Sequence, residues 1–320
     1  MAKTDLTKSL LARFDRLKGQ RQNWETHWQE VADYMQPRKA DVTKTRSKGD
    51  KRTELIFDSS PIQAVELLAA SLHGMLTNPA TPWFSLRYKN SELDGNDEAK
   101  LWLESATEVM YTAFSRSNFQ QEIFELYHDL ITFGTAAMHI QEDNKDVLKF
   151  STRHINEIYI AEDDKGGIDT VYRKFKITVR AALQQFGKNT SLEIQKLATK
   201  DPYKEIEILH AVYPRSDYNP KLKDTDNMPF ESVYLEYKNA NELSVSGFQE
   251  FPFVVPRYLK ASHEVYGRSP AMTALPDVKM LNEMSKTTIK AAQKQVDPPL
   301  LVPDDGFLLP VRTVPGGLNF

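Results

Sequence analysis

Prolines bound a long helix-forming stretch near the end of the sequence. Pro276 fits the first turn of a helix, where the missing N–H would have no partner in any case, whereas Pro298 and Pro299 cannot continue one. No glycine or proline stands between residues 277 and 297. The sequence therefore predicts a helix of about twenty residues, roughly 30 Å long. Any fold of this chain has to accommodate that rod between two proline-containing loops.

Four lysines share one face of the predicted helix. They stand seven, four and four residues apart, at Lys279, Lys286, Lys290 and Lys294, and these spacings bring residues together on a helix surface. The other faces carry apolar or small residues, namely Met280, Leu281, Met284, Thr288 and Ala291. Two interpretations stay open: a solvated lysine face on a core-packed helix, or a helix that packs sideways against copies of itself and turns its lysines to a polyanion.

A basic segment follows the first part of the chain. Residues 38–52 contain seven Lys or Arg against Asp41 and Asp50, a surplus of five positive charges in a chain of net charge −3. The seven are Arg38, Lys39, Lys44, Arg46, Lys48, Lys51 and Arg52. The segment has no hydrophobic period, so we expect a loop over residues 38–57. This loop is either a solvated linker or an arm that binds phosphate or a partner protein.

Helices dominate the first part of the predicted fold. Hydrophobic residues recur at helical spacing from residue 6 to residue 35, and again over 62–76 in a segment rich in Ala and Leu that we expect to be buried. Two further amphipathic helices are predicted over 98–114 and 119–132. The aromatic alternation from Trp83 to Tyr88 is typical of a strand.

Strands dominate the middle of the chain. Alternating apolar and polar residues predict them at 136–140, 147–150, 158–160, 170–177, 205–212, 232–237 and 242–248. A short helix over 179–186 ends at Gly187. Residues 251–258 are apolar but contain Pro252 and Pro256, so we expect an edge strand or an extended loop there. The predicted fold class is α+β, and its edge strands are candidates for pairing with another subunit.

Composition excludes several classes of protein. A charged fraction of 27% and a hydrophobic fraction of 40% are typical of a folded, soluble chain. No apolar run is long enough to cross a membrane and no secretory signal starts the sequence, so we expect a cytoplasmic product without membrane contact. The chain has no cysteine, which excludes disulfides, thiolate catalysis and cysteine zinc sites.

The sequence contains no recognisable enzyme motif, cofactor site or metal site. It has neither a glycine-rich phosphate loop nor a Gly-x-Ser-x-Gly motif. The histidines are scattered, His27 with Glu30 is best explained as a surface polar pair, and Asp304 with Asp305 as a loop turn. We therefore predict a protein that is not an enzyme and that uses no cofactor or metal. A cytoplasmic α+β enzyme is kept as an alternative.

Five motifs occur in one order over almost the whole chain. They are Trp24-x-x-x-Trp28-x-Glu30-x-Ala32-x-Tyr34-x-x-Pro37; Asp58-x-Ser60-x-x-x-Ala64-x-x-x-Leu68-Ala69-Ala70-x-Leu72; Thr77-Asn78-Pro79-x-x-x-Trp83-Phe84; Tyr266-Gly267-Arg268-Ser269-Pro270; and Asp297-Pro298-Pro299-Leu300-Leu301-Val302-Pro303. In this combination the sequence resembles the head-to-tail connector, or portal, proteins of short-tailed bacteriophages. Their shared order is far more specific than any single motif.

The resemblance implies a ring, usually a dodecamer, at one vertex of the capsid. Terminase packs double-stranded DNA through such a ring, and the DNA later leaves through it, without sequence-specific contacts. The implied partners are other copies of the chain, the terminase large subunit, a tail adaptor, and capsid and scaffold proteins. The implied location is the virion, after assembly in the host cytoplasm. The implied DNA contacts are the lysines of the long helix, Lys279, Lys286, Lys290 and Lys294.

The resemblance also suggests a division of the chain, from the order of its parts alone. Residues 1–204 are wing-like and include the basic loop at 38–57, residues 205–262 are clip-like, and residues 263–297 form the stem-like helix. Residues 298–320 begin an inner loop or second wing region, which we expect to be incomplete because family members are longer. Another ring component of phage assembly, such as an adaptor or a scaffold-like protein, is the main alternative.

Overall fold

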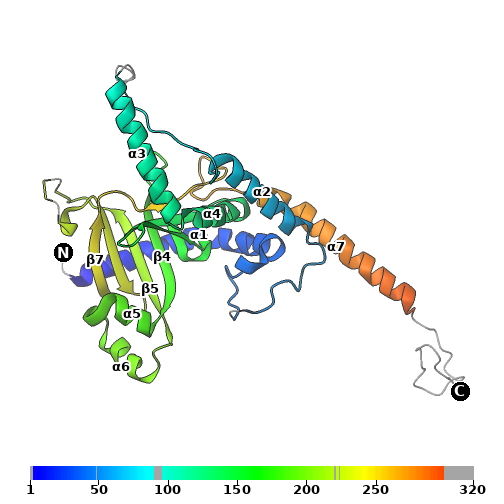
Figure 1. Cartoon of the computed structure of the whole chain (residues 1–320). Helices are drawn as coiled ribbons and strands as arrows, with labels where there is room; N and C mark the ends of the chain where they lie inside the picture. Colours follow the sequence, from blue (N-terminus) through cyan, green and yellow to red (C-terminus); the bar gives the residue numbers. More distant parts are fainter. Residues whose placement is uncertain (1–2, 48, 90–95, 220, 223, 299–320) are drawn as a thin grey trace, which may run out of the picture.

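Figure 1 presents the computed structural model, which describes residues 3–47, 49–89, 96–219, 221–222 and 224–298. Helices and antiparallel sheets both occur in it, which confirms the predicted α+β class. The helices are α1 (Lys3–Met35), α2 (Ser60–Leu76), α3 (Asp97–Arg116), α4 (Phe119–Phe133), α5 (Val179–Phe186), α6 (Leu192–Lys200) and α7 (Pro270–Val296). The strands are β1 (Ala137–Asp143), β2 (Val147–Arg153), β3 (Ile158–Glu162), β4 (Ile168–Thr178), β5 (Glu205–Pro214), β6 (Phe230–Glu236), β7 (Asn241–Phe248) and β8 (Phe253–Val254).

Two antiparallel sheets make up the β part. The larger sheet follows the order of the chain, β3-β4-β5-β6-β7, and the smaller has the order β2-β1-β8, as is common for strands joined by short connections. Strand β8 lies at the edge of the smaller sheet, where Phe253 pairs with His139 of β1. The proline-containing residues 251–258 therefore contribute an edge strand, as predicted.

Helix α1 joins the two halves of the core. Its first half lies across the five-stranded sheet, where Phe14 packs edge-on against Tyr159 at a centroid distance of 4.7 Å. Its second half contributes Trp28 and Met35 to a larger core shared with α4, β1 and the start of α7. The helix passes Gly19 without a break. One continuous rod thus packs against the sheet at one end and the helical layer at the other (Figure 1).

Helix α2 is far more exposed than its sequence predicts. Its buried residues are Pro61, Val65 and Ala69, whereas Leu67 is 70% exposed and Met75 is 82% exposed. The prediction of a buried helix is therefore wrong. A high apolar content indicates a hydrophobic helix but does not say how many of its sides are covered, and α2 packs mainly on α4.

Residues 83–88 do not form the predicted strand. They are extended, but they pair with no strand of the described chain. Their backbone is bonded instead to side chains of α3, among them the hydroxyl of Tyr111. Helix α6 was not predicted at all, although Ser191 caps it by accepting from the N–H of Ile194.

Helix α7 begins at Pro270 rather than at Pro276. Ser269 is its N-cap, and the Ser269 hydroxyl accepts from the N–H of Met272. Pro276 therefore lies inside the helix, where its ring removes one backbone donor. The predicted start at Pro276 is wrong. The pair Ser269-Pro270, an N-cap serine followed by a proline at the first helical position, is an earlier start signal in the same sequence.

The larger sheet runs across the boundary between the predicted wing-like and clip-like regions. Strands β3 and β4 come before residue 205, and β5 follows it and pairs with β4 from Val171–Val212 to Thr178–Glu205. Residues 205–262 therefore do not form a separate β unit in this fold. Their clip-like assignment stays a prediction.

A pair of buried histidines lies where the two sheets meet. His139 of β1 stacks on Phe253 at 4.5 Å, and its ring centroid is 6.0 Å from that of His210 on β5. Burial, together with the charges of Arg153 and Arg173, lowers the pKa of His139 to about 3. Burial also lowers the pKa of His210, and the neighbouring His139 lowers it further. Both rings are therefore neutral in the folded chain near pH 7.

We predict that these histidines make stability fall as the pH drops below 6.5, the ordinary histidine pKa. In that range the unfolded chain binds protons that the folded chain excludes, which costs about 1.4 kcal/mol per pH unit for each group. The substitution His139→Phe keeps the stacking on Phe253 and removes one titration. Urea unfolding at several pH values should give a shallower loss of stability in this variant, and an unchanged slope would contradict the account.

Candidate functional site

The first element of the site is the point where the chain enters α7. Gly134 ends α4 with φ +74°, in the left-handed region, and its backbone touches that of Gly267 so closely that a Cβ on either residue would collide with the other's carbonyl oxygen. The N–H of Gly267 donates to Oγ1 of Thr135 at 2.8 Å. Two glycines are therefore required where the end of α4 crosses the segment that leads into α7.

Aromatic residues of α1 complete this crossing. The ring of Tyr266 lies 5.1 Å from that of Trp28 and 5.9 Å from that of Trp24. The indole N–H of Trp28 donates to the carbonyl of Phe133 at 3.0 Å, so it also fixes the end of α4. The Ser269 hydroxyl donates to the carbonyl of Thr132 at 2.9 Å while it caps α7. The first and fourth sequence motifs thus meet in space and hold the start of α7 on α1 and α4.

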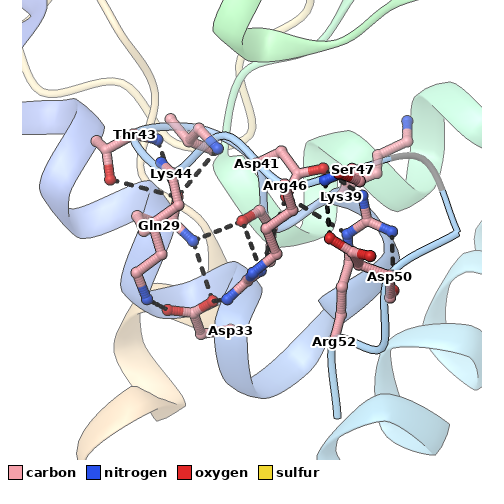
Figure 2. A network of polar contacts seen from close by, with 12 residues as sticks. Gln29, Asp33, Lys39, Asp41, Thr43, Lys44, Arg46, Ser47, Asp50 and Arg52 are labelled. Carbon is pink, nitrogen blue, oxygen red and sulfur yellow. Dashed lines mark hydrogen bonds and ion pairs between the residues drawn. The ribbon is translucent and has the colours of Figure 1, made fainter. Parts of the chain in front are cut away.

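The second element is a segment over residues 40–59, which we call the strap. Figure 2 shows how Gln29 of α1 holds its first part. The side-chain oxygen of Gln29 accepts from the N–H groups of Val42, Thr43 and Lys44 at 3.0, 2.9 and 3.2 Å. Its side-chain nitrogen donates to the carbonyl of Ala40 at 2.7 Å. One buried amide therefore hydrogen-bonds to the backbone of four residues in a turn of the strap.

A second buried amide holds the far end of the strap on α7. The side-chain oxygen of Asn282 accepts from the N–H groups of Phe57 and Asp58 at 2.7 and 3.2 Å. Its nitrogen donates to the carbonyl of Leu55 at 2.8 Å. The strap is therefore bonded to α1 at one end and to the middle of α7 at the other, and both buried amides have their hydrogen bonds satisfied by its backbone.

Most cations of the basic loop are paired with carboxylates of this chain. Lys44 lies 2.7 Å from Asp33, Arg46 lies 3.5 Å from the same residue, and Arg52 pairs with Asp41. Arg38 faces Glu66 at 3.8 Å, with both side chains more than half exposed. Lys51 is exposed, and Lys48 lies outside the described residues. The local surplus of positive charge is thus largely compensated by α1, α2 and α4.

Lys39 makes the most buried of these contacts. Its ammonium lies 2.7 Å from Asp129 and 2.6 Å from Glu125, both on α4. Asp129 is only 1% exposed; burial raises the pKa of its carboxyl, and Lys39 acts in the opposite direction. A charge in this position stays ionised only with a partner at hand. Lys39 therefore anchors the start of the basic loop to the helical core.

The third element is the lysine face of α7. All four lysines lie on this one helix, as predicted, but their surroundings differ. Lys279 pairs with Glu30 of α1, and Lys286 lies 3.0 Å from Glu283 of α7 itself. Lys290 and Lys294 are exposed, and within the described ranges no carboxylate is found beside them. The free positive charge of the row is therefore concentrated towards the end of the helix.

Among the described residues, nothing covers the end of α7. Every residue from Thr287 to Pro298 is exposed, including Ile289 at 46% and Val296 at 87%. Figure 1 shows this half of the helix extending away from the body of the chain. Residues 299–320, which include most of the fifth motif, lie outside the described part. Helices of globular proteins are normally stabilised by packing an apolar face, and no described residue supplies that packing here.

The described residues hold no group of three or more His, Asp or Glu side chains placed to bind a metal ion. Over the same residues, no helix is long and apolar enough to span a membrane.

We predict that Gly267→Ala destabilises the fold by about 3 kcal/mol, because the added methyl would strike the backbone of Gly134. The matched control is Gly74→Ala in α2, where a Cβ meets nothing within 4 Å. This control should gain about 0.5 kcal/mol from helix propensity. Urea unfolding measures the stability of both variants. Equal stability of the two would contradict the close backbone contact between Gly134 and Gly267.

Comparison with known proteins gives a consistent result. Residues 7–320 match the family described as bacteriophage head to tail connecting protein. The chain is 35% identical over 326 aligned residues to a probable portal protein of Bordetella phage BPP-1, covering 100% of this chain and 59% of the relative. It is 32% identical to the portal protein of Salmonella phage epsilon15, covering 100% of this chain and 58% of the relative.

The match runs through the crossing, the strap and the lysine face, which span residues 24–294. The chain covers less than two thirds of the length of these two curated relatives. On this evidence, the chain belongs to the bacteriophage head to tail connecting protein family.

Proposed function

We propose that this chain is a portal subunit, and that copies of it form a ring, expected to be a dodecamer, at one vertex of a phage capsid. In this ring α7 is the stem helix that lines the channel for double-stranded DNA. The names of the two curated relatives support the portal assignment. The role of α7 rests on the exposure of its second half, where Lys290 and Lys294 have no carboxylate partner among the described residues.

The residues around that lysine row suit a ring of parallel helices. At about 100° per residue, Met280, Met284 and Ala291 lie on one side of the row, and Ile289 and Val296 lie on the other. Met284 is 58% exposed and Ile289 is 46% exposed, so both sides are free to contact another molecule. Two unlike apolar flanks form a heterologous contact, which repeats around a ring when its rotation closes. The lysines between the flanks then all face one axis.

Such a ring would bind DNA by charge alone. Phosphates present a sequence-independent negative surface, and contacts to them carry no base information. Repetition of Lys290 and Lys294 around the axis gives two circles of positive charge, comparable to the charged rings of ion-selective pores. Lys279 and Lys286 are partly neutralised by Glu30 and Glu283. We therefore expect weaker DNA contacts from these two lysines than from Lys290 and Lys294.

The remaining roles follow from the portal assignment. We propose contacts with terminase, with a tail adaptor and with capsid and scaffold proteins, assembly in the host cytoplasm, and a final place in the virion. The basic loop suits a structural role better than phosphate binding, because its described cations other than Lys51 face carboxylates of the same chain. A non-catalytic role agrees with these surfaces, and the clip-like function of residues 205–262 belongs to the same proposal.

The ring itself is tested by negative-stain electron microscopy of the purified chain at several salt concentrations. We expect annular particles with a central hole. A chain that stays monomeric at high protein concentration in every salt condition would contradict the proposal. Replacing Met284 and Ile289 by Asp, one at a time, should abolish the particles, because each flank would then bury an unpaired carboxylate.

The DNA contact is tested with Lys290→Ala combined with Lys294→Ala. The salt dependence of double-stranded DNA binding should become shallower by about two ions per chain, since each lysine that neutralises a phosphate releases nearly one counterion. The matched control is Lys196→Ala with Lys200→Ala, which removes the same charge from the exposed side of α6. If the two double variants change the slope equally, the lysine face has no special role.

A further inference from the structure

The extended residues 83–88 have the properties of a strand without a sheet. Their side chains alternate, with Phe84, Leu86 and Tyr88 half-buried and Ser85 and Arg87 exposed. They follow the turn after α2 and run beside α3 (Figure 1). Aromatic and branched residues in this alternation fit a pleated, half-covered surface. The segment therefore keeps the shape of a strand although no described strand pairs with it.

Side chains of α3 hydrogen-bond to the backbone groups along one edge of this segment. The hydroxyl of Tyr111 accepts from the N–H of Phe84 at 2.7 Å and donates to the carbonyl of Phe84 at 2.8 Å. It also accepts from the N–H of Trp83 at 2.6 Å. Oγ1 of Thr107 accepts from the N–H of Leu86 at 3.3 Å. Side chains of a helix thus take the place of a neighbouring strand on this edge.

The opposite edge has no partner among the described residues. In an extended chain the N–H groups of successive residues point in opposite directions, so those of Ser85 and Arg87 point away from the α3 contacts. Neither N–H has a partner within the part of the chain that the structure describes. An open edge of this kind is a ready template for another extended chain.

The outer edge of strand β2, in contrast, is covered by side chains of this chain. Strand β2 has β1 on one side only, yet the N–H of Phe150 donates to Asn118 at 2.9 Å and that of Thr152 donates to Glu122 at 2.6 Å. Asn118 also donates to the carbonyl of Phe150 at 2.8 Å. Natural proteins cover edges that must not pair. The chain covers this edge and leaves that of residues 83–88 free.

The surroundings of the open edge select the chemistry of a partner. A cavity of about 720 Å³ is lined by the segment and α3, with Phe84, Leu86 and Leu103 among its apolar residues and Lys100, Glu104 and Glu108 among its charged ones. The exposed side of the segment carries Arg87 and Lys89, and no carboxylate partner is found for either in the described ranges. A second strand would place every other side chain on the face of Phe84 and Leu86 and the alternate ones beside these two cations. Opposite charges directly across a strand pair stabilise it.

We propose that residues 83–88 are a docking site for an extended segment of a partner protein, which adds to this edge as a β-strand with alternating apolar and acidic residues. The main-chain hydrogen bonds of Ser85 and Arg87 supply affinity, and the apolar face of Phe84 and Leu86 together with the two cations supplies specificity. A second copy of this chain is a poorer fit. Among its own edge strands, β7 alternates Glu242, Ser244 and Ser246 with apolar residues, so serines stand at two positions where the site calls for carboxylates.

The test uses the hexapeptide Glu-Val-Glu-Val-Glu-Val as a probe and Lys-Val-Lys-Val-Lys-Val as its matched control. Amide exchange is followed residue by residue in the intact chain. We expect the acidic peptide to slow exchange at Ser85 and Arg87 by about tenfold or more, while Phe84 and Leu86, already bonded to α3, change little. The lysine peptide should leave all four unchanged.

A pair of variants isolates the backbone contact. Ser85→Pro removes one outward N–H that has no described partner in the chain, and Ser85→Ala keeps it. The proline variant should lose the protection at Arg87 by the acidic peptide, and the alanine variant should retain it. Three results would overturn the proposal: no protection by millimolar acidic peptide, equal protection by the lysine peptide, or protection of Ser85 and Arg87 in the peptide-free chain at high concentration. The last would mean that a second copy occupies the edge.

Discussion

The contact between the backbones of Gly134 and Gly267 is the constraint on which the arrangement of this chain depends. No side chain fits at either position, so the end of α4 and the segment leading into α7 are fixed against each other by main-chain atoms. Tyr266 and Trp28 then pack edge-on beside this point, and Ser269 adds a hydrogen bond to α4. The direction of α7 is therefore set at its root, where its buried residues lie, and its second half needs no support from the body to point outward.

The charges of the chain divide into those used inside the subunit and those left free. The basic loop is the densest positive segment of the sequence, yet its described cations other than Lys51 face acids on α1, α2, α4 or the strap itself. The free charge of α7 is small in number but stands on an exposed helix. A sparse row suits a channel, since many strong phosphate contacts would hold DNA in place. Position in the fold, more than the count of lysines, decides which cations are available.

Sequence patterns predicted those elements whose signal is local. The short helix over 179–186, the strands of the larger sheet and the alignment of the α7 lysines all follow from periodicity and from proline or glycine boundaries. Other features could not be predicted, because each depends on a partner distant in the chain. They are the exposure of α2, the lack of strand pairing at residues 83–88, and the hydrogen bonds of Gln29 and Asn282 to the strap. An amide on a helix carries no local sign that it will bind a loop found eleven or more residues away. Residue spacing predicted the lysine face and the resemblance to portal proteins suggested its contact with DNA, but only the fold could separate its paired members from Lys290 and Lys294.

The central claim is that α7 contacts its neighbours through two different flanks. The chain has no cysteine, so Met284→Cys and Ile289→Cys place single thiols on the two sides of the lysine row. Under mild oxidation the double variant should give a ladder of covalently linked oligomers that ends at the ring size, while each single variant should give no ladder. A double variant that forms no linked oligomers, or a single variant that dimerises as efficiently, would contradict a ring built from the unlike flanks of this helix.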